Sequence, residues 1–551
     1  MPQVREEALD TDGPSARDTA APQRSSSSET LRSLFDRPAA LRWLGFGGAV
    51  LLGISAWVGG ALPAFRVGEN PITVLTGPRG AAIYPLWICG TAALCTAWWL
   101  GRRHVGTGTL TGRWVATTAA LWLLPMLLAP PFGSRDVYAY ACQGAVAAAG
   151  HNPYIDGASA LPCPWLESVP PIWRDTPAPY GPVFVMLAHA GARLGSLTAS
   201  IVFFRLLALA GVVLIAAALP RLARRAGVPV DRALWLGLAC PLVAEHLIGG
   251  AHNDALAIGL LITGFAVLTI RSRDNVRLDG AAAVRLIAGG VLIGCAVGVK
   301  ATAAVALPFA ALYAAGSLAW PMTRAVAARA GAVLFSAAGT VVGLAYASGL
   351  GFGWVKALSH EGDSVVWTSP PTAVGLTIGY VGRLFGPHLH AEQAARLVAL
   401  ALLPIVLALI LWRCRNERRL EGAGLALVAT IFLAPIFQPW YLAWPLVLFA
   451  VTNTARRWFF IVVLVASAIE LPDGNGFTKI LQVPGAILMT AVTVWVAKRC
   501  VWLVWRRQAE ATPSLAPSKQ RTLRRSPGPV LTPRRVRNGR RARAMTHDVT
   551  A

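Results

Sequence analysis

Long apolar stretches recur along almost the whole chain and are separated by short polar segments. Each stretch has about 16 to 25 residues between Arg, Pro or Gly boundaries, which is the length that an α-helix needs to cross a bilayer. We count about fourteen of them, beginning near Leu41, Ala81, Arg113, Ala199, Ala233, His252, Arg285, Thr302, Arg324, Gln393, Gly422, Trp440, Arg457 and Pro484. Three pairs of stretches, those at 233 and 252, 285 and 302, and 422 and 440, are separated by only a few polar residues, so each is a hairpin or one broken helix. The pattern predicts an all-α polytopic membrane protein with about 12 to 14 transmembrane helices.

The composition agrees with this prediction. Of the 551 residues, 55% are hydrophobic and 14% are charged, whereas soluble chains carry about 25% charged residues. A soluble protein is therefore excluded. The sequence contains no P-loop, GxGxxG or GxSxG motif in a strand-turn-helix context and no soluble segment long enough for a nucleotide domain. We therefore expect no cytosolic nucleotide-sugar donor and no coupling to ATP, and we expect the substrate to be reached from the outer face.

Basic residues exceed acidic residues by 50 to 26, which gives a net charge of +24. In a soluble chain this excess would suggest nucleic-acid binding, but in a membrane protein the orientation of the loops accounts for it first. With the N-terminus placed in the cytoplasm, every inside loop is rich in arginine, and the longer outside segments hold only scattered bases. The sequence thus predicts a multi-pass plasma-membrane protein with both termini in the cytoplasm and no nucleic-acid partner.

The chain divides into three regions. Residues 1–40 are predicted to be a disordered cytoplasmic N-terminus without a Sec-type signal peptide, and residues 41–505 form the transmembrane domain. Residues 506–551 are predicted to be a basic, disordered cytoplasmic tail that lies near anionic membrane lipids. Two outside segments, 131–198 and 349–392, are too long to be simple connections, and loops of that length usually carry a function.

The first of these outside loops combines a predicted helix with a rigid remainder. The helix is expected from about Asp136 to Ala149, and the proline-rich segment that follows has a restricted backbone. Asp136 stands where the third apolar stretch leaves the membrane, beside Arg135, a base that either holds the carboxylate ionised or binds a phosphate. The alternative is that Asp136 serves only as the N-cap of the helix.

Polar residues also gather at the outer ends of the fifth and sixth stretches. Glu245 and His246 are followed by a run that ends in His252, Asn253 and Asp254. Ionisable groups at a membrane boundary are costly unless they line a cavity, so this cluster is a candidate site. Metal binding is one interpretation, although the spacing matches no standard signature, and a hydrogen-bonded structural cluster is the other.

Two further features lie at predicted outer turns. Lys300 stands between the seventh and eighth stretches, where it either pairs with a lipid phosphate or extends to the interface. Gln438, Trp440 and Tyr441 stand at the turn between the eleventh and twelfth stretches. Aromatic residues at such a turn form either the usual interfacial belt or a platform on which a sugar stacks.

Several short motifs, taken together, resemble those of one enzyme family. They are Arg135–Tyr138, His151–Tyr154, Pro177–Pro182, His252–Asp254 and Gln438–Tyr441. They look like the motifs of the actinobacterial polyprenyl-phosphate-mannose-dependent mannosyltransferases, which are multi-spanning GT-C glycosyltransferases. The resemblance is greatest to the α-(1→6)-mannosyltransferases of lipomannan core synthesis. It covers about residues 41–505 and excludes both tails.

The resemblance implies an enzyme that moves mannose from polyprenyl-phosphate-mannose to a growing lipid-linked α-(1→6)-mannan on the outer face of the plasma membrane. GT-C enzymes carry an acidic residue in the first large external loop, which matches Asp136, although about three stretches precede it here instead of one. The donor is a β-linked mannosyl phosphate and the product an α-mannoside, so the reaction inverts the anomeric centre with Asp136 as the general base.

The other implied roles concern binding. The donor phosphate is assigned to Arg135, Lys300 and His252, because fixed cations stabilise the charge that develops on a leaving phosphate. Contacts to the sugar or the acceptor are assigned to Tyr138, Asn253, Asp254, Gln438, Trp440 and Tyr441. A monophosphate donor can be bound by arginine and lysine, so we expect no required cofactor and no divalent metal.

Cys142 and Cys163 lie in the same outside loop. We hypothesise that they form a disulfide, because that side of the membrane is oxidising. Two other functions compete with the one implied by the resemblance: a lipid-linked-sugar flippase or polysaccharide exporter, and a GT-C transferase of another sugar. Purified protein separates a transferase from a flippase, because only a transferase consumes the sugar-lipid without two aqueous compartments.

Overall fold

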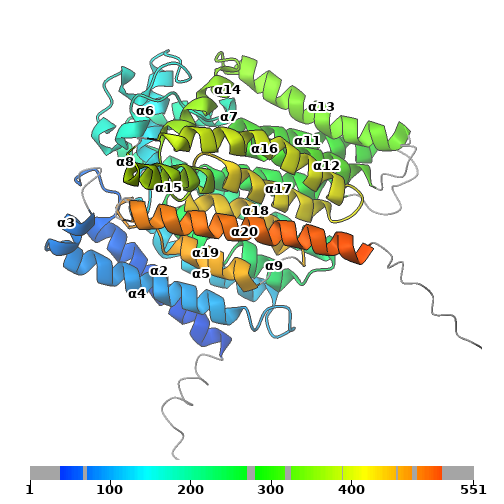
Figure 1. The fold of residues 1–551 in the computed structure, drawn as a ribbon, viewed down its shortest axis with the longest axis horizontal. Coiled ribbons are helices and arrows are strands. Elements are labelled where there is room, and N and C mark those ends of the chain that lie inside the picture. The colour runs from blue at the N-terminus through cyan, green and yellow to red at the C-terminus, as the bar shows by residue number, and fades with distance from the viewer. Residues whose placement is uncertain are drawn as a thin grey trace, which may run out of the picture. The chain divides into compact units, whose positions relative to one another are not determined.

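The computed structural model describes residues 37–65, 71–269, 280–316, 324–386, 389–453, 457–474 and 481–511. Within these ranges the chain is helical and contains no strand (Figure 1). Of the N-terminus predicted to be disordered (1–40), residues 1–36 lie outside the described residues and residues 38–40 are helical. Of the tail predicted to be disordered (506–551), residues 512–551 lie outside the described residues and residues 506–511 are helical. Residues up to Val494 form one compact unit, and the residues from Trp495 form a second one. All candidate site residues belong to the first unit.

The α-helices follow one another in this order: α2 (Pro38–Gly59), α3 (Pro71–Thr76), α4 (Gly80–Gly101), α5 (Gly112–Leu128), α6 (Asp136–Ala148), α7 (Pro182–Ala192), α8 (Leu197–Ala226), α9 (Val230–Gly237), α10 (Asp254–Val267), α11 (Gly280–Val299), α12 (Leu307–Ala315), α13 (Arg324–Ala347), α14 (Gly353–Ala357), α15 (Pro370–Leu384), α16 (Ala391–Cys414), α17 (Arg419–Leu433), α18 (Ala443–Ala450), α19 (Arg457–Ser467) and α20 (Gln482–Ala511). Shorter 3₁₀ segments are η1 (Ala158–Ala160), η2 (Leu166–Ser168), η3 (Pro171–Trp173), η6 (Ala301–Ala306), η7 (Leu358–Asp363) and η8 (Pro439–Leu442), and η4 (Val243–Gly249) is a π-helix.

The structure supports a membrane protein but does not confirm the expected number of spans. Six helices of the described residues, α2, α4, α8, α11, α13 and α16, are long and apolar enough to cross a bilayer, and the bent pair η4 and α10 makes a seventh. α7, which lies in the predicted outside loop 131–198, is an apolar helix of 10 to 17 residues that is not among the predicted stretches. Several predicted stretches form helices in the same range of lengths, such as α5 and the segments 301–315 and 439–450. The last two begin with 3₁₀ turns, so an apolar run read as one span is partly irregular backbone.

Small residues allow close packing between the long helices. α2 packs against α4, and α11 lies beside α13, as Figure 1 shows. At the contact between α8 and α10, a Cβ atom added to Gly211 would lie 2.2 Å from the carbonyl oxygen of Ala255. Only glycine fits at this position, because no neighbouring backbone can move that far. Buried Trp98 and Trp235 join α4 to α9 by each donating its indole N–H to the other's carbonyl oxygen, at 3.0 and 3.1 Å.

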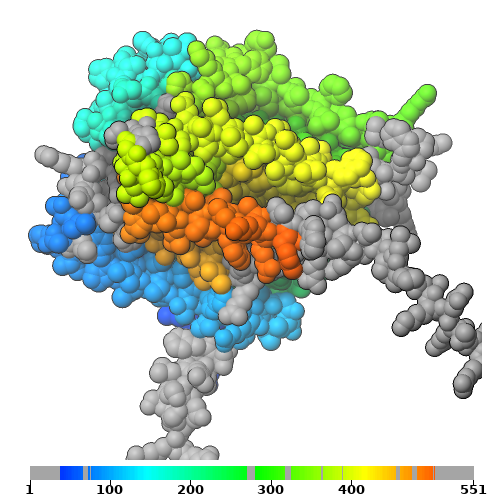
Figure 2. Space-filling view, viewed as in Figure 1, coloured from blue at the N-terminus to red at the C-terminus, as the bar shows by residue number. Residues whose placement is uncertain are grey.

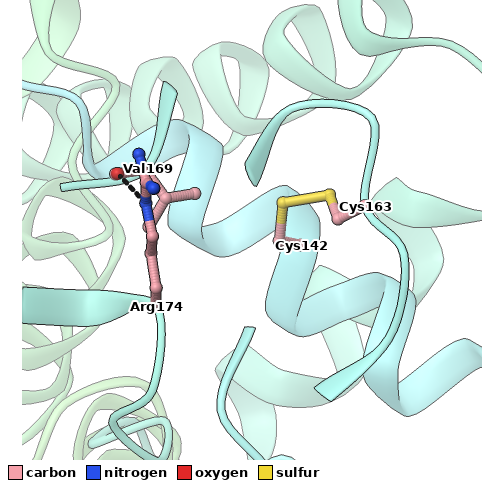
Figure 3. Close-up of a disulfide and its surroundings, with 4 residues drawn as sticks. All are labelled: Cys142, Cys163, Val169 and Arg174. Atoms are coloured by element: carbon pink, nitrogen blue, oxygen red, sulfur yellow. Dashed lines mark hydrogen bonds between the residues drawn. A yellow bond between two sulfur atoms is a disulfide. The ribbon is translucent and has the colours of Figure 1, made fainter. Parts of the chain in front are cut away.

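The first long outside loop is an ordered part of this unit. α6 begins at Asp136 and ends at Ala148, which confirms the helix predicted there. A disulfide joins Cys142 of α6 to Cys163, and the Arg174 Nε donates to the Val169 carbonyl oxygen at 3.0 Å (Figure 3). Figure 2 shows the cyan surface of this loop beside the green surface of α13 and α14. The loop is thus tied both covalently to α6 and by packing to the rest of the unit.

Candidate active site

A small cavity brings together residues from distant parts of the chain. Asp136, Ala139 and Gln143 of α6 line one side, and the other lining residues are Trp173, Pro179, Tyr180, Lys300, Ile436, Gln438, Trp440 and Tyr441. Five of these, Asp136, Lys300, Gln438, Trp440 and Tyr441, are residues that the sequence predicts to form the site. A carboxylate, an ammonium group and four large aromatic rings therefore face one space of about 40 Å³.

Two larger cavities do not combine these groups. One, of about 580 Å³, is lined by residues around Arg418 and Arg419, and both guanidinium groups already bond to Glu421 or to carbonyl oxygens of their own segment. The other, of about 520 Å³, has mostly apolar walls, and its one cation, Arg205, donates to the carbonyl oxygens of Leu127, Ala129 and Gly249. We therefore place the candidate site at the small cavity on chemical grounds.

Asp136 stands in the first turn of α6 with its side chain partly exposed. Its own backbone N–H donates to the Ser134 Oγ at 3.2 Å, and the N-cap position of the helix is Arg135. No side-chain hydrogen bond caps this helix from that position. The carboxylate is thus not used as the cap of this helix. This geometry leaves Asp136 available to accept a proton from a molecule in the cavity.

His252 lies directly behind this carboxylate. Its Nδ1 is 3.4 Å from the Asp136 Oδ2, and its ring stacks on the Trp440 ring with centroids 4.0 Å apart. The His252 side chain is fully buried and does not line the cavity. The His252 ring therefore does not reach a donor phosphate bound in this cavity, which differs from the role that the resemblance implies.

Lys300 and Asp254 form a buried ion pair. The Lys300 Nζ is 2.8 Å from one oxygen of Asp254, and the Trp444 indole N–H donates to the other oxygen at 2.7 Å. The same ammonium group lies 4.6 Å from the centre of the Tyr441 ring, a cation–π distance. Asp254, with no exposed side-chain surface, positions Lys300 and does not face the cavity.

Three residues that the sequence assigned to the site lie elsewhere. The Arg135 guanidinium donates to the carbonyl oxygens of Leu62, Phe65 and Asp473, at 3.1 to 3.3 Å. The hydroxyl of Tyr138 donates to the Ala61 carbonyl oxygen, and Asn253 is buried outside the cavity lining. Helical periodicity explains Tyr138, because positions 136, 139 and 143 share one face of α6 and position 138 lies on another face. Arg135 is the N-cap residue and precedes the first turn of the helix.

Sequence reasoning missed Gln143, Trp173 and Tyr180 as lining residues. Gln143 is one place where a signal existed, because it follows Asp136 by seven positions and so lies two turns along the same helix face. Tyr180 packs edge-to-face on Tyr140 at 5.4 Å, which fixes its segment against α6. The next residue, Gly181, has no room for a side chain, since a Cβ atom there would lie 2.4 Å from the Gly298 carbonyl oxygen, two residues before Lys300.

Two family models match the chain. The first, described as "Alpha-(1->6)-mannopyranosyltransferase, N-terminal domain", matches residues 42–316, and the second, described as "MptB C-terminal domain", matches residues 371–499. A probable alpha-(1->6)-mannopyranosyltransferase of Mycolicibacterium smegmatis is 34% identical over 87% of this chain and 91% of its own length. The chain belongs to the alpha-(1->6)-mannopyranosyltransferase family. It is therefore an enzyme of the glycosyltransferase class.

Other family members are similar over comparable lengths. An alpha-(1->6)-mannopyranosyltransferase of Mycobacterium tuberculosis is 32% identical over 88% of this chain and 91% of its own length. Alpha-(1->6)-mannopyranosyltransferase B of Corynebacterium glutamicum is 30% identical over 78% of this chain and 75% of its own length. No solved structure matches the chain. In this family member both matched segments contribute to the cavity, because Asp136 and Lys300 belong to the first, and Gln438, Trp440 and Tyr441 to the second.

A second buried carboxyl group near the cavity gives a pH-dependent prediction. Glu470 lies in the segment between α19 and α20, and burial, with smaller contributions from Asp473 and Asp136, raises its pKa to about 8. The unfolded chain loses this proton near the ordinary glutamate pKa of about 4.3. Between these two values the folded protein binds more protons, so the free energy of unfolding falls as the pH rises.

Replacing Glu470 by Gln removes the titrating group and, with it, this fall in the free energy of unfolding at high pH. We expect Glu470→Gln to be more stable than the wild type at pH 9 and equally stable at pH 4.5, as measured by thermal unfolding in detergent. The exposed Glu417, replaced by Gln, serves as the control and should give no such pH-dependent difference. A Glu470→Gln effect of the same size at both pH values would show that the residue does not retain its proton in the folded protein.

Proposed function

We propose that this enzyme transfers mannose from polyprenyl-phosphate-mannose to a growing lipid-linked α-(1→6)-mannan, the core of lipomannan and lipoarabinomannan. The reaction takes place on the outer face of the plasma membrane and inverts the anomeric centre. The observation that carries the proposal is that Asp136 and Lys300 face the same aromatic-lined cavity. The names of the relatives support mannose as the sugar and the α-(1→6) linkage.

The reaction needs one base and one cation. An acceptor hydroxyl attacks the anomeric carbon of mannose, its proton passes to Asp136, and the bond between the anomeric carbon and the phosphate oxygen breaks. The bonding electrons leave with polyprenyl phosphate, which is a good leaving group and needs no acid. Lys300 stabilises the negative charge that grows on this phosphate, because a fixed ammonium group requires no reorganisation as the charge forms. Trp440, Tyr441 and Gln438 contact the sugar.

The outer-face location rests on the arginine pattern. Asp136 lies in the segment 131–198, which the positive-inside rule puts outside, and both substrates carry lipid anchors that keep them at the membrane surface. Because a polyprenyl monophosphate carries less charge than a nucleotide diphosphate, we propose that Lys300 serves the role that a divalent cation serves with nucleotide sugars.

Purified protein in detergent tests this function. With radiolabelled polyprenyl-phosphate-mannose and a short α-1,6-mannoside acceptor, we expect label to move into a longer glycan, and we expect no transfer from a nucleotide-linked mannose. In detergent no membrane separates two aqueous compartments, so a flippase would leave the sugar-lipid chemically unchanged. If the labelled sugar-lipid is not consumed, the transferase proposal is wrong for this donor. Transfer from another polyprenyl-phosphate sugar would instead show that the enzyme is specific for a different sugar.

A further inference from the structure

A sharp break in the chain places His252 behind Asp136. The π-helix η4 and α10 meet at an angle of 109°, and the break lies at residues 250–253. Ala251 adopts a left-handed backbone with φ of 52°, which is unfavourable for a residue that has a Cβ atom. At Gly250 a Cβ atom would lie 2.6 Å from the His252 ring. The backbone thus takes a strained path to place this one ring.

The buried His252 ring has no structural hydrogen bond that would explain it. Neither ring nitrogen has a hydrogen-bond partner in the described part of the chain, although the side chain is fully buried. A buried polar group without a partner is costly. His246 in the same cluster is buried in the same way, so what sets His252 apart is the carboxylate of Asp136 beside its Nδ1. The nearby Asp136 oxygen, 3.4 Å from Nδ1, is in reach, and catalytic hydrogen bonds are often this long before a substrate binds.

We propose that His252 is a positioning residue that holds the base Asp136. This inference rests on the proposed function, in which Asp136 takes the acceptor proton. The Nδ1–H of His252 donates to Oδ2 of Asp136 when the substrates are bound, which leaves Oδ1 to receive the proton from the acceptor hydroxyl. Stacking on Trp440 fixes the plane of the imidazole, so its N–H direction is set before the substrate arrives. His252 acts through Asp136 and does not contact the donor phosphate.

Three substitutions of His252 separate this role from a purely structural one. His252→Asn keeps an N–H donor near the position of Nδ1, His252→Gln moves the donor to the position of Nε2, and His252→Phe keeps only the ring. We expect kcat to fall about 10- to 100-fold in His252→Phe and His252→Gln, the usual effect of losing a partner that orients a functional group. We expect His252→Asn to stay within about fivefold of the wild type, and the KM for the donor to stay within about twofold in all three.

His246 supplies a matched control. It is another fully buried imidazole, 5.9 Å from the same Trp440 ring, and it makes no ion-pair contact with Asp136. We expect His246→Asn to keep kcat within about threefold of the wild type, and gel filtration in detergent verifies the folding of every variant. If His252→Asn is as slow as His252→Phe, or if the main change is in the donor KM, the positioning role is wrong.

A double-mutant cycle separates this inference from the proposed function. In the Asp136→Asn background, His252→Phe should lower the remaining rate by less than about twofold, because the two side chains act as one unit. A full additional loss of 10-fold or more in that background would overturn the inference and leave Asp136 as the base. Failure of the wild type to transfer mannose would instead overturn the proposed function.

Discussion

Replacing Asp136 by Asn is expected to lower the rate of mannosyl transfer by a factor of about 10² or more. Asparagine keeps the shape of the side chain but cannot accept the proton of the acceptor hydroxyl. Because Lys300 remains in place on the other side of the cavity, the KM for the donor should change by less than about threefold. The measurement is initial-rate transfer of radiolabelled mannose by purified protein at saturating acceptor.

A carboxylate in the same outside loop provides the control for this experiment. Asp156 pairs with His151 at 3.5 Å and does not line the cavity, so Asp156→Asn should transfer mannose at close to the wild-type rate. If Asp136→Asn were as active as Asp156→Asn, the base would be another group and the assignment of this cavity would lose its main support.

Lys300→Met is expected to reduce kcat/KM by a factor of about 10² or more, because it removes the only cation that lines the cavity in the described part of the chain. It should also destabilise the fold, since it leaves Asp254 buried without a counter-ion, and breaking a buried ion pair costs about 3 to 5 kcal/mol. Activity and stability would therefore fall together in this variant and could not be interpreted separately.

The double variant Lys300→Met with Asp254→Asn separates the two effects. Asparagine needs no counter-ion and can still accept the hydrogen bond from Trp444, so thermal stability in detergent should return toward the wild-type value. The transfer rate should stay low, because no ammonium group faces the donor phosphate. If the rate recovers together with the stability, Lys300 is a structural counter-ion and has no role at the phosphate.

The sequence predicts which segments meet at the site better than it predicts what each residue does there. Asp136, Lys300, Trp440 and Tyr441 stand out because polar and aromatic residues at the ends of apolar stretches need a reason to be there. Their partners do not stand out. The pairing of Lys300 with Asp254, and of Asp136 with His252, depends on a break at residues 250–253 that no local pattern reveals. The assignment of Asp254 to substrate binding therefore could not be corrected from the sequence alone.

Helix geometry explains two further differences. Tyr138 is only two residues from Asp136 in the sequence, but the turn of about 100° per residue carries it to another face of α6, and Arg135 lies at the N-cap before the helix begins. The difference between the predicted number of spans and the number of long apolar helices also comes from helix geometry. Hydropathy detects apolar residues but not whether the helix that contains them is continuous, and segments such as 439–450 combine a 3₁₀ turn with a short helix.

The stacking of His252 on Trp440 and the bond from Trp444 to Asp254 both connect the segment matched by the N-terminal family model to the segment matched by the C-terminal one. The two halves of the polypeptide are therefore joined by contacts just behind the cavity. A chimera that exchanges one half between relatives keeps its chemistry only if both of these pairings are preserved across the junction. The remaining walls of the cavity, which include Gln143, Trp173 and Tyr180, take no part in either pairing, so an exchange of these residues would leave both pairings intact.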